Sequence, residues 1–348
     1  GAAFSPAAMP ICRVNSEAPA RLFYQVHRAP DLRDGEERGH CFLCTGFQTE
    51  GYTWEPQLRP LLARGYVCAT FDNRGCGRSE KPRYRYTSSM LARDAMELLC
   101  GELRWRPRDV HLIAISLGGM YGLEMMAGLR EAAYVDIAGA DETSFLSATL
   151  MVTQAVGWRD PIHGFVPLTY FPVVVNSRLV PGSAKAKLFR DMEQAFSRDW
   201  LRADSGARHP KSGARLTNGQ SLVRRGAKEY YAKAAEGLEP ENGVAAAVAQ
   251  IFAIATHRVD HERLEALAGH LRRQGCPVLV VCAGNDRLVR YSNQRRLADA
   301  LGAAVVELVD LADSSHGVTD ERRDEVNAAI ARVLDEAERR RERAVGSE

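Results

Sequence analysis

The 348-residue sequence predicts an α/β fold built on a mostly parallel, doubly wound sheet with helices on both faces. Continuous apolar runs, such as residues 278–282, are typical of strands that are buried on both sides. Segments with helical periodicity, such as residues 293–301, separate these runs along the chain. Around Ser116, an apolar run leads through a tight turn directly into a helical pattern. Together these three observations favour alternating strands and helices.

The amino-terminal part of the chain is expected to supply most of the sheet. Residues 1–19 are expected to be irregular because prolines interrupt them, and a charged turn is expected at 31–37. Alternating side chains favour an early strand at 21–27. Further strands are predicted at 41–47, 65–72, 110–113 and 146–152, and helices at 54–63, 88–103 and 120–133, with a loop at 136–143.

The carboxyl-terminal part resumes this alternation, with strands predicted at 278–281 and 304–309 and helices at 293–301 and 320–339. The chain is longer than a typical domain of about 100–200 residues, and an insertion explains the surplus. We therefore expect a core in two parts, 1–153 and 256–348, interrupted by an insertion at 154–255. Residues 339–348 are expected to be a solvated, charged tail.

The insertion is expected to be a mainly helical cap that lies over one edge of the sheet. Prolines crowd an aromatic cluster, and an amphipathic helix is predicted at 184–201. The aromatic side chains either line a substrate pocket or form the small core of the cap itself. A basic stretch at 208–228 lacks interleaved aromatic residues, which favours a flexible solvated loop. The candidate pocket residues are Trp158, Phe165, Tyr170 and Phe171.

The charge balance argues against a polyanionic partner. The chain has 46 Lys and Arg residues against 44 Asp and Glu residues, and the net charge of +2 predicts neither nucleic-acid nor acidic-membrane binding. No apolar run reaches the about 18 residues that span a bilayer, so we expect a soluble protein without integral membrane association. The expected partner is a small-molecule substrate, and nothing in the sequence indicates an oligomeric state.

The eight cysteines favour a reducing, cytoplasmic compartment. Cys41 and Cys44 form a C-x-x-C pair, but residues three apart on a strand point to opposite faces and do not chelate one ion. His257 and His261 lie four apart without a nearby third ligand, so we expect surface histidines. We predict no metal and no cofactor. Because the chain does not begin with methionine, a targeting peptide that has been removed stays compatible with the sequence.

The hexapeptide at 114–119, Ala-Ile-Ser-Leu-Gly-Gly, has the form of a nucleophile elbow. Small residues on both sides of Ser116 allow the sharp turn that holds its hydroxyl clear of the sheet. Ala114 stands where the G-x-S-x-G form of the motif has glycine. The alternative for Ser116 is a helix N-cap, which is a common role for serine.

Two downstream residues supply the base and the acid that a serine nucleophile requires. Asp286 follows the predicted strand at 278–281, and His316 lies in a polar loop after the next strand. Asp136 and Asp141 are rival acids because they follow the helix after the elbow. The position of Asp286 at the end of a strand favours it over both.

The order Ser116, Asp286, His316, each after its own strand, is the order of an α/β-hydrolase triad. Residues 72–79, Asp-Asn-Arg-Gly-Cys-Gly-Arg-Ser, fit the D-x-R-G-x-G-x-S loop of many such proteins. Over residues 20–153 and 256–336 the chain therefore resembles the α/β-hydrolase superfamily of the serine-nucleophile type, with an inserted cap. The resemblance implies the α/β-hydrolase fold.

The resemblance also implies an oxyanion hole formed by the backbone N–H groups of Phe47 and Leu117. Thr45 stands where the superfamily usually has histidine in the loop before Phe47. Because the required donor is a backbone group, a different side chain at Thr45 does not remove it.

The activity that the resemblance implies is that of a serine hydrolase with a catalytic triad and an acyl-enzyme intermediate. A carboxylic ester of a small or medium-sized apolar substrate is the expected target, as in the EC 3.1.1 esterases. Thioesterases, acyltransferases and carbon–carbon bond hydrolases use the same triad. A non-catalytic or slow ligand sensor on the same fold is a further alternative, which the complete triad disfavours.

Overall fold

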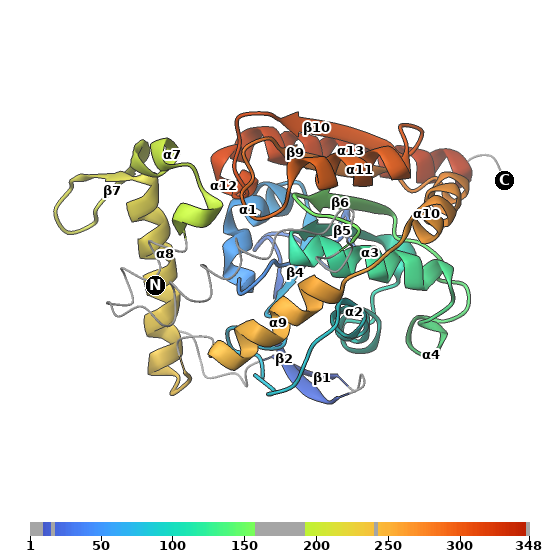
Figure 1. Ribbon diagram of the computed structural model, residues 1–348, viewed down its shortest axis with the longest axis horizontal. Helices are drawn as coiled ribbons and strands as arrows, with labels where there is room; N and C mark the ends of the chain where they lie inside the picture. The colour runs from blue at the N-terminus through green and yellow to red at the C-terminus, as the bar shows by residue number, and fades with distance from the viewer. Residues whose placement is uncertain (1–9, 15–17, 157–191, 240–242, 346–348) are drawn as a thin grey trace.

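A computed structural model describes residues 10–14, 18–156, 192–239 and 243–345. In these ranges the centre of the molecule is an eight-stranded sheet with the order β1-β2-β4-β3-β5-β6-β9-β10 (Figure 1). β2 pairs antiparallel with β1 and β4, and the other pairs are parallel, which confirms the predicted fold class. The strands are β1 (Ile11–Val14), β2 (Ala20–His27), β3 (Gly39–Cys44), β4 (Tyr66–Phe71), β5 (Val110–Ile115), β6 (Ser147–Met151), β9 (Val278–Ala283) and β10 (Val306–Leu311).

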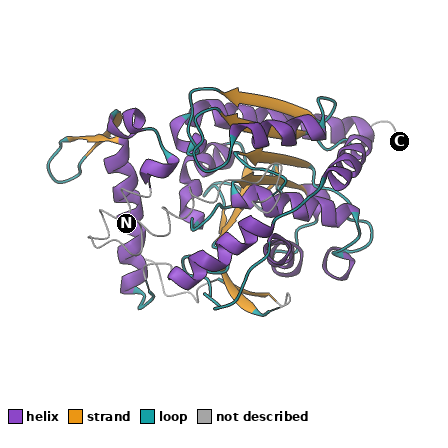
Figure 2. Ribbon diagram, in the orientation of Figure 1, coloured by secondary structure: helices purple, strands orange, loops and turns teal. Residues whose placement is uncertain are grey.

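Helices cover both faces of the sheet, which explains why its central strands are apolar throughout (Figure 2). Alternate residues of β9 join two separate hydrophobic clusters, as the two-residue period of a strand requires. One cluster includes residues of α2 (Ser88–Met96), α3 (Leu117–Arg130), α10 (His261–Gln274) and α11 (Tyr291–Leu301). The other includes residues of α1 (Glu55–Ala63) and α13 (Arg323–Val345).

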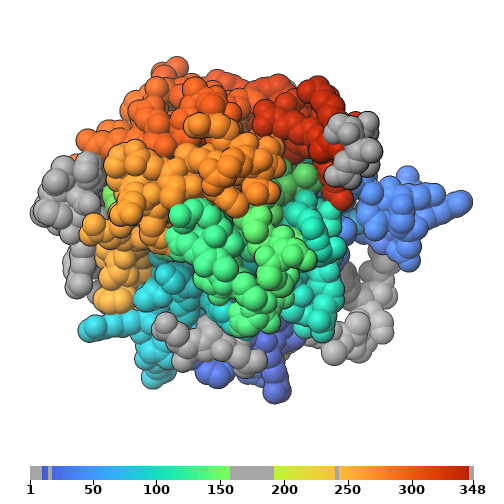
Figure 3. Space-filling model, turned by 90° about the vertical axis from the view of Figure 1, so that its right-hand side faces the viewer, coloured from blue at the N-terminus to red at the C-terminus, as the bar shows by residue number. Residues whose placement is uncertain are grey.

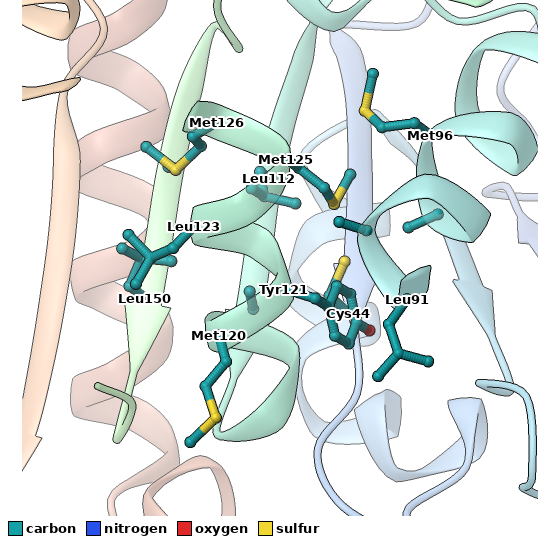
Figure 4. Close-up of a cluster of buried hydrophobic side chains, with 14 of the residues drawn as sticks. Cys44, Leu91, Met96, Leu112, Met120, Tyr121, Leu123, Met125, Met126 and Leu150 are labelled. Atoms are coloured by element: carbon teal, nitrogen blue, oxygen red, sulfur yellow. The ribbon is translucent and has the colours of Figure 1, made fainter. Parts of the chain in front are cut away.

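The helix α3, which begins directly after Ser116, is buried on almost every side. Figure 4 shows its side chains between β5, β6 and α2: Leu123 lies near Leu150, and Tyr121 lies near Cys44 and Leu91. Burial of a side chain of this size contributes about 1.5–3 kcal/mol. The start of α3 is therefore held rigidly against the carboxyl ends of the central strands.

The chain between β6 and β9 leaves the sheet and forms α7 (Arg198–Arg202), a hairpin of β7 (Asp204–Arg208) and β8 (Arg215–Thr217), α8 (Asn218–Ala235) and α9 (Val244–Thr256). In Figure 1, α7, β7 and α8 lie to the left of the sheet. The opposite side is turned to the viewer in Figure 3. It includes α10 in orange and the region of α4 (Val135–Ala138) in green.

Several local predictions were wrong. The basic stretch at 208–228 is a loop only at 209–214, between the two strands of the hairpin; after β8, Thr217 and Gln220 form a capping box that begins α8. The expected helix at 184–201 is interrupted within its described part. The side chain of Ser197 accepts a hydrogen bond from the N–H of Trp200 and so begins a new helix, α7. The irregular amino-terminal segment contains β1, which pairs with β2. The loop expected at 136–143 includes part of the short helix α4.

Candidate active site

The turn at Ser116 has the backbone of a nucleophile elbow. Ser116 has φ 55° and ψ −121°, a conformation that non-glycine residues rarely adopt. Its N–H donates to the carbonyl of Met151, and its carbonyl accepts from the hydroxyl of Thr153 at 2.7 Å. The Ser116 side chain makes no capping hydrogen bond to α3, although the residue occupies the N-cap position. Its hydroxyl is thus not used as a helix cap.

Close backbone contacts explain the small residues around the elbow. A Cβ atom on Gly118 would lie 2.2 Å from the carbonyl oxygen of Cys44, so only glycine fits there. The methyl group of Ala114 is accommodated because it faces Gly122 of α3, where a Cβ atom would lie 3.4 Å away. The replacement of glycine by Ala114 is therefore compatible with the turn.

The carboxylate of Asp286 binds His316 and is fully buried. Its Oδ2 atom lies 2.8 Å from Nδ1 of His316 and accepts a second bond from the Gln294 side chain, also at 2.8 Å. Its Oδ1 atom accepts from the backbone N–H groups of Leu288 and Val289 at 2.8 and 2.9 Å. Four donors thus surround one carboxylate and fix its orientation toward the imidazole.

Gln294 was missed by the sequence reasoning. It lies in α11 with no exposed surface, and its Oε1 atom also accepts from the N–H of Ala283 at the end of β9. The position of Gln294 at the first turn of the helix after Asp286 was the available signal. The two rival acids lie elsewhere: Asp136 is exposed and paired with Arg93, and Asp141 is exposed.

The loop that carries His316 is held by hydrogen bonds to Glu321 and to the segment before α7. The carboxylate of Glu321 accepts from the N–H of Ser315 at 2.7 Å and from the N–H of Ser197 at 2.6 Å. The N–H of Gly317 donates to the carbonyl of Ala195 at 2.7 Å. The segment before α7 is therefore bonded directly to the histidine loop.

Ser116 and His316 line the same cavity, which has a volume of about 310 Å³. Both residues are nearly buried, at 4% and 8% exposure. Apolar side chains in the wall include Phe47, Ile115, Met192, Phe196, Leu222 and Leu288, and charged ones are Glu50, Arg225 and Asp320. The predicted pocket residues Trp158, Phe165, Tyr170 and Phe171 lie outside the described residues.

The two predicted oxyanion donors lie on either side of the elbow. Phe47 lines the cavity, and a Cβ atom on the preceding Gly46 would lie 3.2 Å from Cβ of Ser116. Leu117 is the first residue of α3, where backbone N–H groups have no partner within the helix. Thr45 is buried beneath this loop, with both of its oxygen atoms 3.2 Å from the Asn73 amide nitrogen.

Among the described residues, no group of three or more His, Cys, Asp or Glu side chains is arranged to hold a metal ion. All eight cysteines are buried as free thiols. The expectation of two surface histidines was wrong for His257, which is buried directly after α9, whereas His261 is exposed at the start of α10. In the same described ranges, no helix has the length and apolar character that a membrane crossing requires.

Comparisons with known proteins agree with this architecture. Residues 40–329 match the sequence model of the alpha/beta hydrolase family. RutD, a proposed carbamate hydrolase of Variovorax paradoxus, is 34% identical over 105 residues, which are 30% of this chain and 36% of that protein. The chain thus matches little more than a third of this relative's length.

Solved structures match over nearly the whole chain. An esterase from Thermogutta terrifontis aligns with a TM-score of 0.64 and 15% identity, over 94% of this chain and 99% of its own. An enol-lactonase from Burkholderia xenovorans LB400 aligns with a TM-score of 0.64 and 20% identity, over 94% and 100%. At these identities the likeness is one of fold.

Proposed function

The chain belongs to the alpha/beta hydrolase family, and we propose that it hydrolyses carboxylic esters of small or medium-sized apolar substrates. In this proposal Ser116 is the nucleophile, His316 the general base and Asp286 the acid that orients it. The observation that carries the proposal is the 2.8 Å bond between His316 and Asp286, at the wall of the cavity that Ser116 also lines.

The proposed reaction follows from the hydrogen bond that His316 makes to Asp286. Because Nδ1 of His316 is held by Asp286, Nε2 is the nitrogen that takes the proton of the Ser116 hydroxyl. The serine oxygen attacks the ester carbonyl, and the N–H groups of Phe47 and Leu117 stabilise the resulting oxyanion. The intermediate collapses to an acyl-enzyme as His316 protonates the departing alcohol. Water, deprotonated by His316, then releases the carboxylic acid.

The wall of the cavity supports an apolar acyl or alcohol group. Apolar side chains such as Phe196 and Leu222 contribute much of it, and a volume of about 310 Å³ is at the lower end of the range of ligand sites. The proposed cap, residues 154–255, supplies Met192, Phe196 and Leu222 to this wall. We therefore place substrate selection in the cap and the chemistry in the sheet and its loops.

The test is hydrolysis of p-nitrophenyl esters of graded acyl length by the parent protein and by Ser116→Ala. We expect turnover of short to medium chains, and a loss of about 10⁶-fold in kcat in the variant, as for other triad serines. Ser221→Ala is the matched control, since this serine lies on α8 and donates to Ser205 outside the proposed site. It should keep the parent rate.

The other outcomes distinguish the alternatives. Turnover of Ser116→Ala within about tenfold of the parent would contradict the nucleophile assignment. Serine-dependent turnover of thioesters or of carbon–carbon substrates, with no turnover of oxygen esters, would replace the esterase proposal by another activity of the same triad. A folded protein without activity on any of these substrates would favour the ligand-sensor alternative.

A further inference from the structure

One polar side chain in the apolar helix α9 bonds directly to the loop of the proposed oxyanion hole. Gln250 lies between Ala249 and Ile251, and it has no exposed surface. Burial of an amide is unfavourable unless new hydrogen bonds replace those that it makes to water. A glutamine at this position in an otherwise apolar helix therefore calls for specific partners.

Gln250 uses both ends of its amide. Its Oε1 atom accepts from the backbone N–H of Gln48 at 2.9 Å and from the Gln48 side chain at 3.1 Å. Its Nε2 atom donates to the carbonyl oxygen of Arg74 and to Sγ of Cys76, both at 3.0 Å. The side chain thus joins the loop after β3 to the loop after β4, and both to α9.

The bond to Gln48 acts on a strained point of the chain. Gln48 has φ 54°, a region of backbone conformation that is unfavourable for a residue other than glycine. The peptide N–H that Gln250 holds belongs to the residue directly after Phe47, whose own N–H is the proposed oxyanion donor. On the other side of Phe47, Gly46 packs against Ser116. Phe47 therefore lies between Gly46, which is close to the nucleophile, and Gln48, whose N–H is bound by Gln250.

We infer that Gln250 is a positioning residue, which aims the N–H of Phe47 at the oxyanion of the reaction. The inference rests on the proposed function, since it assigns a task within the same site. A residue with a purely structural task would change stability alone. A residue with this task changes the binding of the transition state while leaving the binding of the substrate intact.

The experiment compares Gln250→Met, which keeps the shape and removes every polar contact, with Gln250→Glu, which keeps an oxygen to accept from Gln48. For each, kcat and KM are measured on the preferred ester, together with the affinity for a trifluoromethyl ketone analogue that forms a tetrahedral oxyanion on Ser116. Ser147→Ala is the control. It removes a buried 2.7 Å bond to His111 at the amino-terminal ends of β5 and β6, whereas Ser116 follows the carboxyl end of β5.

For Gln250→Met we expect kcat to fall about 10- to 100-fold, less than the 10²–10³-fold that removal of an oxyanion donor costs. KM should stay within about threefold, and the affinity for the ketone should fall by the same factor as kcat/KM. Gln250→Glu should lie between Gln250→Met and the parent. Ser147→Ala should lower the melting temperature only.

Parent-like kcat and ketone affinity in Gln250→Met, with only a lower melting temperature, would overturn the inference. Failure of both Gln250 variants to fold would overturn it as well, by assigning the residue to stability. Neither result would affect the proposed function, which fails only if Ser116→Ala stays active or the parent hydrolyses no ester.

Discussion

Residues at the site are held in conformations that cost free energy, and their neighbours offset this cost. Ser116 has a positive φ, and a strained backbone of this kind costs about 1–3 kcal/mol. Its N–H donates to the carbonyl of Met151, the last residue of β6, and its carbonyl accepts from the hydroxyl of Thr153, just after that strand. Hydrogen bonds to the end of β6 and to the residues just after it therefore hold the turn in this conformation.

At the same scale, the acid is tested by Asp286→Asn. The amide keeps one oxygen for the N–H groups of Leu288 and Val289 but presents the wrong partner to Nδ1 of His316. We expect kcat to fall by about 10⁴-fold, as for the corresponding change in other triads, with little change in fold. Steady-state kinetics and a thermal melt measure both effects.

Asp136→Asn and Asp141→Asn are the controls for this prediction, because both carboxylates are exposed. Each should keep the parent kcat. If Asp141→Asn were more damaging than Asp286→Asn, the acid of the site would have to be reassigned.

Residue types and their order were enough to propose Ser116, Asp286 and His316 as a set, because each follows its own strand, and the structure brings Asp286 to His316 and places Ser116 and His316 at one cavity. The supporting residues were harder to predict. Gln250 is a polar residue in an otherwise apolar helix, and its partner Gln48 lies 202 positions away in the sequence. Hydrogen bonds of this kind depend on the tertiary arrangement, for which a single sequence has no local signal.

Among the elements, α8 is attached to the core mainly by charge. Its residues Arg225, Glu229 and Lys233 are spaced by four and so share one face of the helix. Arg225 pairs with Asp320 at 2.9 Å, Glu229 with Arg78, and Lys233 with Glu50 at 2.5 Å. The basic stretch was interpreted as solvated because Asp320, the acidic partner of Arg225, lies 95 positions away in the sequence.

The buried pair of Lys233 and Glu50 gives a test at this scale. Their side chains are only 3% and 12% exposed, so removal of one charge leaves the other without compensation in a poorly solvated place. We expect Lys233→Met to lower the free energy of unfolding by about 3–5 kcal/mol. Denaturant titration measures this loss.

The double variant Lys233→Met with Glu50→Gln removes both charges, and its loss should be smaller than the sum of the two single losses by about 0.5–3 kcal/mol. Additive losses would show that the two side chains act independently. In that case α8 would owe its attachment to its other ion pairs and its apolar contacts.

For the whole molecule, a buried histidine predicts sensitivity to acid. Burial lowers the pKa of His257 to about 3, and its Nδ1 atom lies 3.0 Å from the hydroxyl of Ser88. In the unfolded chain the histidine takes up a proton near pH 6.5, whereas in the folded protein it stays neutral. The unfolded state therefore binds more protons between these values, and stability falls as the pH drops from about 6.5 toward 3.

His257→Asn keeps a polar atom near Ser88 and does not titrate. Its free energy of unfolding should depend less on pH than that of the parent, by up to about 1.4 kcal/mol per pH unit within this window. Urea titrations at pH 7 and pH 4.5 measure the difference. If the free energy of unfolding changed by the same amount between pH 7 and pH 4.5 in both proteins, other groups would be the cause of the acid sensitivity.

The layered sheet, its parallel direction and most of its strands were predictable from the sequence, since apolar runs buried on both faces have no other common explanation. The segment between β6 and β9 was predicted less well. Its helices α7 and α8 bear many charges, and their arrangement depends on caps such as Ser197 and on ion pairs with the core.

The central claim, that Ser116 is an activated nucleophile, is tested most directly by labelling with a fluorophosphonate, followed by intact mass and peptide mapping. We predict the addition of one phosphonyl group to the parent protein, located on Ser116, much slower labelling of Asp286→Asn, and none in Ser116→Ala. Labelling of Ser116→Ala at the parent rate, or a label on another residue of the parent, would contradict the account.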